Sequence, residues 1–145
     1  GGAFINQVLQ EFCEIHENCY LFDSLGSRKY LSMLAGCKVV IGNSSSGIYE
    51  APAFRIPTIN IGNRQNGRVK AKSIVDCKPN KEEIVKAIKM VQSNSFTKKL
   101  KNMKIPFEGG KTAEKILEKI VQVVENKINL QKGFYDIYFK TDIEK

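Results

Sequence analysis

"IGNSSSGIYEAPAFRIPTINIGNRQNGR", residues 41–68, contains two short apolar runs, and a polar loop follows each of them. "KVVIG" (38–42) leads into three serines and a glycine, whereas "PTINIG" (57–62) leads into a loop that holds two arginines. Between them, "SGIYEAPAF" (46–54) has the pattern of a short helix, which Pro52 is expected to stop or kink. The order strand, helix, strand is typical of a βαβ unit with parallel strands.

Further helices and strands are expected on both sides of this unit. Apolar residues recur at helical spacing in some segments and form short runs in others. Asn80, followed by Glu82 and Glu83, is the pattern of a capped helix start. The expected helices are 3–17, 28–36, 80–92 and 111–128, and the further expected strands are 19–22 and 73–77.

The predicted fold class is α/β, a Rossmann-like three-layer parallel sheet with helices on both faces. Residues 1–145 are expected to form one domain, with 129–145 as a C-terminal tail that docks onto another surface. The helix over 111–128 has the strongest apolar stripe, which is expected to face the core: Ile116, Leu117, Ile120, Val121 and Val124.

Composition narrows the class of protein. The 145 residues are 42% hydrophobic and 26% charged, as in globular rather than disordered chains. No apolar run approaches the ~20 residues of a membrane span, and the N-terminus has no signal-peptide pattern. We therefore expect a cytoplasmic protein without a membrane partner.

Neither the cysteines nor the net charge indicates a metal or nucleic-acid site. The four cysteines form no Cys-x-x-Cys pair, and there is a single histidine, so no metal site is predicted. The net charge of +8 comes mostly from lysines in the second half of the chain, and no aromatic residue interleaves with "KKLKNMK" (98–104). Solvated helix faces explain these lysines, and no nucleic-acid partner is expected.

The serine loop has the composition of an anion site. Small residues let a phosphate approach the backbone at a helix N-terminus, and hydroxyl groups add further donors. Gly47 is expected to adopt a backbone conformation that a Cβ would disfavour. An ordinary βα turn needs only one serine as a cap, whereas this loop has Ser44, Ser45 and Ser46. The loop matches neither the phosphate-binding loop of nucleoside triphosphatases nor a nucleophile elbow.

Three charged residues near the two loops fit a nucleotide. Glu50 lies one turn after the serines, where a carboxylate suits ribose hydroxyls, although it could equally be a solvated helix residue. Arg64 and Arg68 follow the next strand, and the planar arginine fork matches phosphate oxygens, although both could be ordinary surface residues. Ligands of such sheets bind beyond the carboxyl ends of the strands, where both loops are expected.

The sequence of 42–68 closely resembles the C-terminal half of the hydrolysing UDP-N-acetylglucosamine 2-epimerases of the sialic acid pathway. "LFDSLGSRKYLSML" (21–34) resembles the family's strand and loop beside the uracil. "FEGGKTAEKI" (107–116) is similar to a Tyr-Gly-Asp/Asn-Gly-x-Ala segment, although "FEGG" departs from it in detail, and "KGFYDI" (132–137) is like the tail of bacterial members. The resemblance spans 1–139 and implies one half of a GT-B fold.

The resemblance implies how a UDP group would be held at its phosphates. The hydroxyls of Ser44 and Ser45 would contact the diphosphate, and Ser46 and Gly47 would contribute backbone N–H groups. Arg64 would reach the nucleotide from the facing loop.

It also implies contacts to the nucleoside. Glu50 would hold the ribose hydroxyls. Leu25, through its backbone, and Tyr30, through its ring, would bracket the uracil. Arg68 matches the family motif but has no contact assigned by the resemblance.

The implied reaction needs no organic cofactor. UDP leaves by elimination across C1 and C2 of the sugar, and water then adds at C1 with inversion at C2, giving N-acetylmannosamine and UDP. The family's proton-transfer residues lie in an N-terminal half that would precede Gly1, so we expect a C-terminal fragment that is inactive alone. The implied partners are UDP or a UDP-sugar, its own N-terminal domain, and further copies in a homo-oligomer.

Three alternatives stay open on the residues alone. The sugar could be a diacetamido sugar that feeds legionaminic acid synthesis. The same nucleotide half would also serve a GT-B glycosyltransferase. The isolated chain could finally be a non-catalytic module that binds a nucleotide or a nucleic acid.

Overall fold

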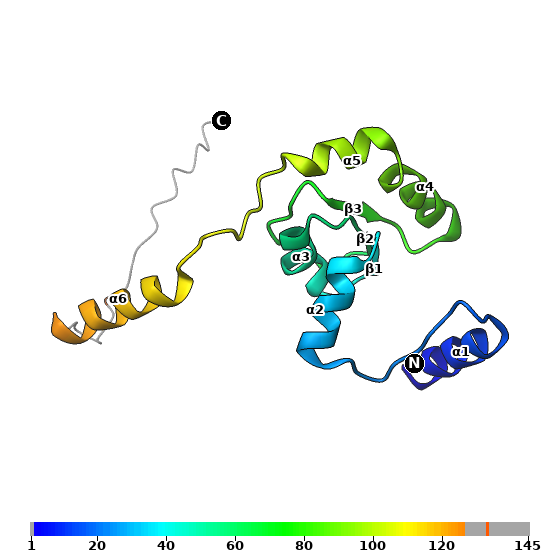
Figure 1. The fold of residues 1–145 in the computed structure, drawn as a ribbon, viewed down its shortest axis with the longest axis horizontal. Helices are drawn as coiled ribbons and strands as arrows, with labels where there is room; N and C mark the ends of the chain where they lie inside the picture. Colours follow the sequence, from blue (N-terminus) through cyan, green and yellow to red (C-terminus); the bar gives the residue numbers. More distant parts are fainter. Residues whose placement is uncertain (1, 127–132, 134–145) are drawn as a thin grey trace, which may run out of the picture. The chain divides into compact units, whose positions relative to one another are not determined.

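The computed structural model describes residues 2–126 and Gly133. The chain divides into two compact units, Gly1–Glu108 and Gly109–Lys145 (Figure 1). The prediction of one domain over 1–145 stays a prediction.

The centre of the first unit is a parallel sheet of three strands. They are β1 (Val40–Gly42), β2 (Thr58–Ile61) and β3 (Ile74–Cys77), in the order β1-β2-β3. The register places Asn60 of β2 between Gly42 of β1 and Asp76 of β3. Three predicted strands are thereby confirmed within one or two residues of their expected ends.

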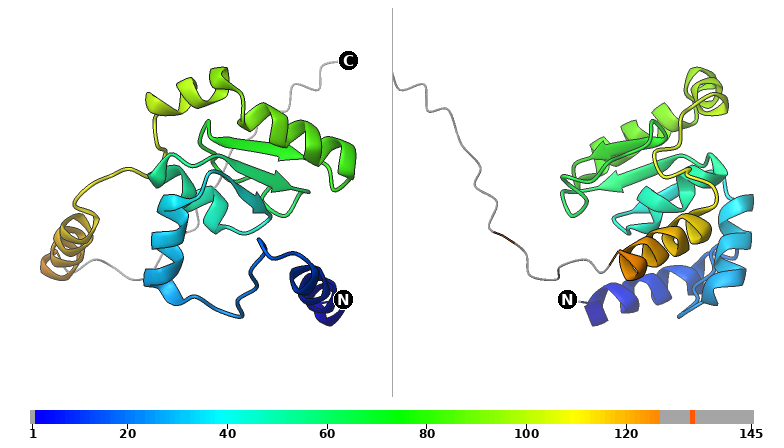
Figure 2. Two further views of the ribbon diagram at one scale, coloured as in Figure 1. Left: turned by 45° about the vertical axis from the view of Figure 1, so that its right-hand side comes forward. Right: turned by 90° about the vertical axis from the view of Figure 1, so that its left-hand side faces the viewer.

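Helices cover both faces of this sheet, as Figure 2 shows. Ile59 of β2 packs against Ala87 and Val91 of α4 (Lys81–Val91). The preceding residue, Thr58, faces the opposite way and contacts Gly47 of α3 (Ser46–Tyr49). The predicted three-layer α/β architecture is therefore confirmed.

The ends of the helices follow the expected chemistry, with one addition. Asn80 caps α4, because its side chain accepts a hydrogen bond from the Glu83 N–H at 2.9 Å. No helix bounds were predicted between residues 92 and 111, yet α5 (Asn94–Lys101) forms there, with Ser93 accepting from the Phe96 N–H. Leu100 of α5 joins a small core with Ala71, Met103 and Ile105.

The two N-terminal helices form as predicted, but the strand between them does not. They are α1 (Gly2–Ile15) and α2 (Gly26–Gly36). Residues 19–22 are irregular, and Tyr20 is 77% exposed. A strand needs a neighbour to accept its backbone hydrogen bonds, and no described strand pairs with this segment. The prediction of a strand over 19–22 is wrong for this structure.

In the second unit, α6 (Thr112–Glu125) confirms the predicted helix. Its apolar stripe is exposed within the described residues of this unit, and the expectation that the stripe faces a core stays a prediction. The helix stands in a unit that offers it no second described element to pack against. The predicted tail over 129–145 lies outside the described residues, apart from Gly133.

Within residues 2–126, no helix is both long enough and apolar enough to span a bilayer.

Candidate functional site

The serine loop follows β1 directly and folds back on itself. The backbone N–H of Gly47 donates to the Ser44 carbonyl at 3.2 Å, and the Ser46 N–H donates to the Ser44 hydroxyl at 3.3 Å. One of the three serines therefore acts as a local cap, while the Ser45 hydroxyl has no hydrogen-bond partner among the described residues. A free hydroxyl next to a preformed turn is available to a ligand.

The helix after this loop is shorter than expected. α3 has four residues, and the backbone tightens into a 3-10 helix, η1 (Ala51–Phe54), which contains Pro52. The expected stop at Pro52 is confirmed. Because the two ends of so short a helix lie only about one turn apart, their partial charges largely cancel. Hydroxyl and arginine groups, rather than a strong helix dipole, must supply the attraction for an anion.

Gly47 is required for a reason other than the one expected. Its backbone is not in the left-handed region, but a Cβ built on it would lie 2.6 Å from Cγ2 of Thr58. Thr58 is buried, and its hydroxyl donates to the Gly47 carbonyl at 2.9 Å. The expectation of a special backbone conformation at Gly47 is therefore wrong, and close packing against β2 explains the glycine.

The loop after β2 that holds Arg64 and Arg68 (62–68), here called the arginine loop, begins with a tight turn. The Asn66 N–H donates to the Asn63 carbonyl at 3.0 Å, which places Arg64 and Gln65 at the two central positions. Gly62 and Gly67 flank this turn with φ of +79° and +77°, values that few other residues tolerate. Arg64 is exposed and makes no hydrogen bond or ion pair with another described residue.

Gln65 joins the two loops and was not singled out by the sequence. The residue is 2% exposed, and its Nε2 donates to the Asn43 carbonyl at 2.7 Å. Asn43 is the first residue of the serine loop, so this bond connects the carboxyl ends of β1 and β2. A glutamine in a polar loop carries no sequence signal of burial.

Arg68 has a structural partner that the sequence could not assign. Its guanidinium carbon lies 5.3 Å from the centre of the Tyr49 ring, a cation–π contact. Tyr49 also packs against Phe107, with ring centres 4.8 Å apart. Arg68 therefore connects the arginine loop to Tyr49 of α3.

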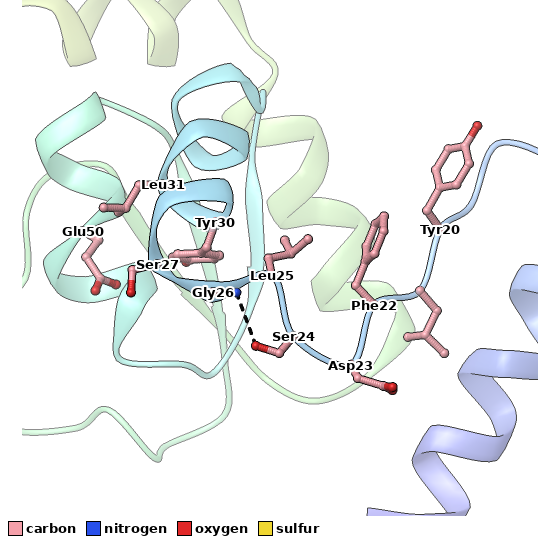
Figure 3. A pocket seen from close by; sticks show the side chains of 11 residues that line it. Tyr20, Phe22, Asp23, Ser24, Leu25, Gly26, Ser27, Tyr30, Leu31 and Glu50 are labelled. Atoms are coloured by element: carbon pink, nitrogen blue, oxygen red, sulfur yellow. Dashed lines mark hydrogen bonds between the residues drawn. The ribbon is translucent and has the colours of Figure 1, made fainter.

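A cleft of about 650 Å³ lies beside the start of α2. Figure 3 shows Glu50, Ser27 and Tyr30 around the first turn of this helix, with Leu25 just before it. The three residues expected to contact a nucleoside, Leu25, Tyr30 and Glu50, thus line one cleft, although Glu50 comes from a different part of the chain. The Tyr30 hydroxyl forms a hydrogen bond with the Ser46 hydroxyl, which connects the cleft to the serine loop.

A polar network lies near the carboxyl ends of β2 and β3. The Asn60 amide donates to Asp76 at 2.6 Å, and the Lys70 ammonium lies 2.7 Å from the same carboxylate. Partial burial by itself would raise the pKa of Asp76, but the hydrogen bonds from Lys70 and Asn60 and the charge of Lys70 together lower it. Asp76 is therefore a structural anion at neutral pH rather than a proton donor.

Two cysteines in and near the sheet lack the lowered pKa of a reactive thiol. Burial raises the pKa of the Cys37 thiol, and burial followed by the charges of Glu83 and Asp76 raises that of Cys77, so both stay protonated at neutral pH. Within 2–126, no group of three His, Cys, Asp or Glu side chains is placed to hold a metal ion.

The chain is similar to several curated bacterial proteins. It is 42% identical over 137 residues to a GDP/UDP-N,N'-diacetylbacillosamine 2-epimerase (hydrolyzing) of Campylobacter jejuni, an alignment that covers 94% of this chain and 35% of the relative. It is 34% identical to the polysialic acid biosynthesis protein P7 of Escherichia coli, with the same coverage of both chains. It is 32% identical to a UDP-N-acetylglucosamine 2-epimerase of Neisseria meningitidis, over 90% of this chain and 34% of the relative.

The chain thus spans about a third of the length of these curated relatives. The family model described as UDP-N-acetylglucosamine 2-epimerase matches residues 3–121, which include all of the residues placed above around the cleft and the two loops. The chain therefore belongs to the UDP-N-acetylglucosamine 2-epimerase family.

Proposed function

We propose that this chain is the UDP-binding half of a hydrolysing UDP-sugar 2-epimerase with the two-domain GT-B arrangement. The observation that carries the proposal is the continuity of the site. A cleft lined by Leu25, Tyr30 and Glu50 connects through the Tyr30–Ser46 hydrogen bond to a serine loop. A base, a ribose and a diphosphate follow one another in the same order along a uridine nucleotide.

Within this site, the diphosphate would lie over the serine loop. We propose that Ser44, Ser45 and Arg64 contact its oxygens, and that Ser46 and Gly47 add backbone N–H groups. In the structure the N–H groups of Ser46 and Gly47 already have partners within the loop. The Ser45 hydroxyl and the Arg64 guanidinium are therefore expected to contribute most to the binding of UDP.

The role of this half in the reaction is to stabilise the leaving group. UDP gains negative charge as its bond to C1 of the sugar breaks, so donors that hold the diphosphate lower the barrier to elimination. Water then adds at C1 of the glycal, with protonation at C2 on the opposite face, which releases the 2-epimeric sugar and UDP. The groups that move protons would come from a second domain, and the complete enzyme would be a homo-oligomer.

The sugar has two candidates. N-acetylglucosamine, giving N-acetylmannosamine, is supported by the family description and the Neisseria relative. A diacetamido sugar is supported by the Campylobacter relative, which has the higher identity. The products that the complete enzyme forms from the two UDP-sugars would distinguish them.

A titration of the isotope-labelled chain with UDP tests the binding proposal. We expect the backbone amide signals of 44–47 and 64–68 to shift with UDP, to shift less with UMP, and to ignore a short DNA duplex. Signals that ignore UDP, or lysine-rich helices that respond to DNA, would contradict it.

Two variants measure the main contacts. Arg64→Ala and Ser45→Ala should each weaken UDP binding roughly 10- to 100-fold, because each removes a hydrogen bond to a charged group. In the complete enzyme, loss of such a donor typically costs ~2.7–4 kcal/mol of barrier, and these variants should fall in or just below that range. Lys98→Ala and Ser95→Ala, which change the same kinds of group on α5, are the matched controls. Unchanged affinity and turnover in both site variants would reject the assignment.

A further inference from the structure

The arginine loop and the serine loop are connected by one buried side chain. The Gln65 amide donates to the Asn43 carbonyl at 2.7 Å across the gap between the ends of β2 and β1. Only the Nε2 side of the amide can face a carbonyl oxygen, so the direction of this bond is fixed. The contact spans 22 positions of sequence and sets the distance between two otherwise separate loops.

The turn that contains Gln65 gives this contact a consequence for Arg64. Gln65 and Arg64 are the two central residues of the turn closed by the Asn66 N–H and the Asn63 carbonyl. Gln65 is buried and Arg64 is exposed. With Gln65 held on Asn43 and the turn closed, the backbone orientation at Arg64 is fixed relative to the serine loop.

Stability alone does not explain a glutamine at this position. Its Oε1 is buried and has no hydrogen-bond partner among the described residues. The cost of this unpaired acceptor offsets what the bond to the Asn43 carbonyl contributes, so an apolar side chain of the same shape would change the stability little. The residue makes one hydrogen bond between the loops and leaves its other polar atom unpaired, so its contribution is to the geometry of the loops rather than to stability.

We propose that Gln65 is a positioning residue that holds Arg64 toward the diphosphate by joining the turn to the serine loop. This inference rests on the proposed UDP site and adds a residue whose own side chain touches no ligand. Gln65 acts on the ligand through Arg64.

Four proteins test the proposal: the unchanged chain, Gln65→Met, Arg64→Ala and the double variant. UDP affinity is measured by calorimetry, and urea unfolding is followed on the same samples. Gln65→Met should weaken UDP binding roughly three- to tenfold, because a misplaced arginine loses part of its contact. In the Arg64→Ala background the same change should have less than about a twofold effect, since residues that act as a unit are not additive. The urea midpoint should stay close to that of the unchanged chain.

Ser73→Ala is the matched control, because Ser73 carries the other buried, unpartnered polar atom among the described residues. It should leave both UDP affinity and the amide signals of 43–47 unchanged, whereas Gln65→Met should shift those signals without ligand. Equal weakening by Gln65→Met in both backgrounds, unshifted signals, or a fall in stability that accounts for the lost affinity would overturn the positioning role. Failure of the unchanged chain to bind UDP would instead reject the proposed function, and the inference with it.

Discussion

The serine loop and the segment 20–27 border one continuous candidate site, yet only the serine loop rests on buried side chains. Gly47 lies against buried Thr58, and Asn43 is held by buried Gln65. In 20–27, by contrast, Tyr20, Leu21 and Phe22 are all large and exposed, and the described contacts leave the segment without a strand partner. The two sides of the site therefore differ in how firmly the described residues hold them.

This difference has a consequence for binding. A group that is already held in place loses little entropy when a ligand arrives, whereas an exposed segment must be ordered during binding. The diphosphate should therefore contribute more to the affinity of this chain than the uracil does. UDP should bind more tightly than UMP, and uridine should bind weakest.

The largest expected effect comes from a substitution at Gly47, in the serine loop that rests on buried side chains. Gly47→Ala places a Cβ 2.6 Å from Cγ2 of Thr58, and this β-branched, buried side chain cannot turn away. Overpacking of this kind typically costs about 1–3 kcal/mol. The urea unfolding midpoint should fall, and UDP affinity should fall with it.

Two comparisons show whether the close contact is the cause. Gly47→Ala combined with Thr58→Ser should recover most of the stability, because serine lacks Cγ2 but keeps the hydroxyl that donates to the Gly47 carbonyl. Gly36→Ala, at a glycine with no atom within 4 Å of the added Cβ, should do no harm. A Gly47→Ala chain as stable as the unchanged one would disprove the packing argument.

The same contrast explains how much of this structure the sequence could predict. Runs of apolar residues locate a strand by its own composition, so "KVVIG", "PTINIG" and "SIVDC" each form one. "CYLF" has a similar composition but pairs with no described strand, and composition does not report whether a partner exists. Strand pairing is a property of two segments, and a pattern in one of them cannot establish it.

Contacts between loops are less visible still. The serines, Glu50 and Arg64 could be chosen from residue type and spacing, because their chemistry suits a nucleotide. Gln65 and Thr58 could not, because their importance comes from burial against residues 22 and 11 positions away. The α6 stripe shows the converse, since its helical period predicts the helix but not the surface that covers it.

The second prediction concerns the ribose and tests whether the cleft belongs to the same ligand as the serine loop. If Glu50 accepts the ribose hydroxyls, the unchanged chain should prefer UDP over 2'-deoxy-UDP by about tenfold, as expected for a hydrogen bond to a charged group. Glu50→Gln should reduce this preference, while the affinity for 2'-deoxy-UDP changes little. Competition binding measures the affinities of each protein for UDP and for 2'-deoxy-UDP. A preference for UDP that is undiminished in Glu50→Gln would show that Glu50 does not bind the ribose hydroxyls.

The third prediction tests the connection between the two sides. Tyr30→Phe removes the hydroxyl that bonds to Ser46 but keeps the ring that lines the cleft. The loss of one hydrogen bond should lower the free energy of unfolding by about 1 kcal/mol. Tyr20→Phe, which removes an exposed hydroxyl, should have no effect. Equal stability of all three proteins in urea would show that the Tyr30–Ser46 bond does not hold the cleft to the serine loop.

The smallest expected effect is a pH dependence of stability that should affect the serine loop and not the segment 20–27. Asp76 pairs in register with Asn60, whose side chain lies on the same face of β2 as Thr58, below the serine loop. The pKa of Asp76 is lowered in the folded chain because Lys70 and Asn60 outweigh the effect of partial burial.

A carboxyl with a depressed folded pKa contributes stability above its unfolded pKa of about 3.9, and loses this contribution as the pH falls through the folded value. With its side chain 53% exposed, the contribution should stay within the ~0–1 kcal/mol of surface ion pairs. Unfolding in urea between pH 7 and pH 3 should therefore show a slightly steeper loss of stability for the unchanged chain than for Asp76→Asn. Asp76→Asn should remove part of the pH response of the amide signals of 43–47 and leave that of 20–25, which contains Asp23, unchanged, because only the serine loop rests on the sheet that contains Asp76. An equal change in both groups of signals would show that the two sides are equally coupled to the sheet.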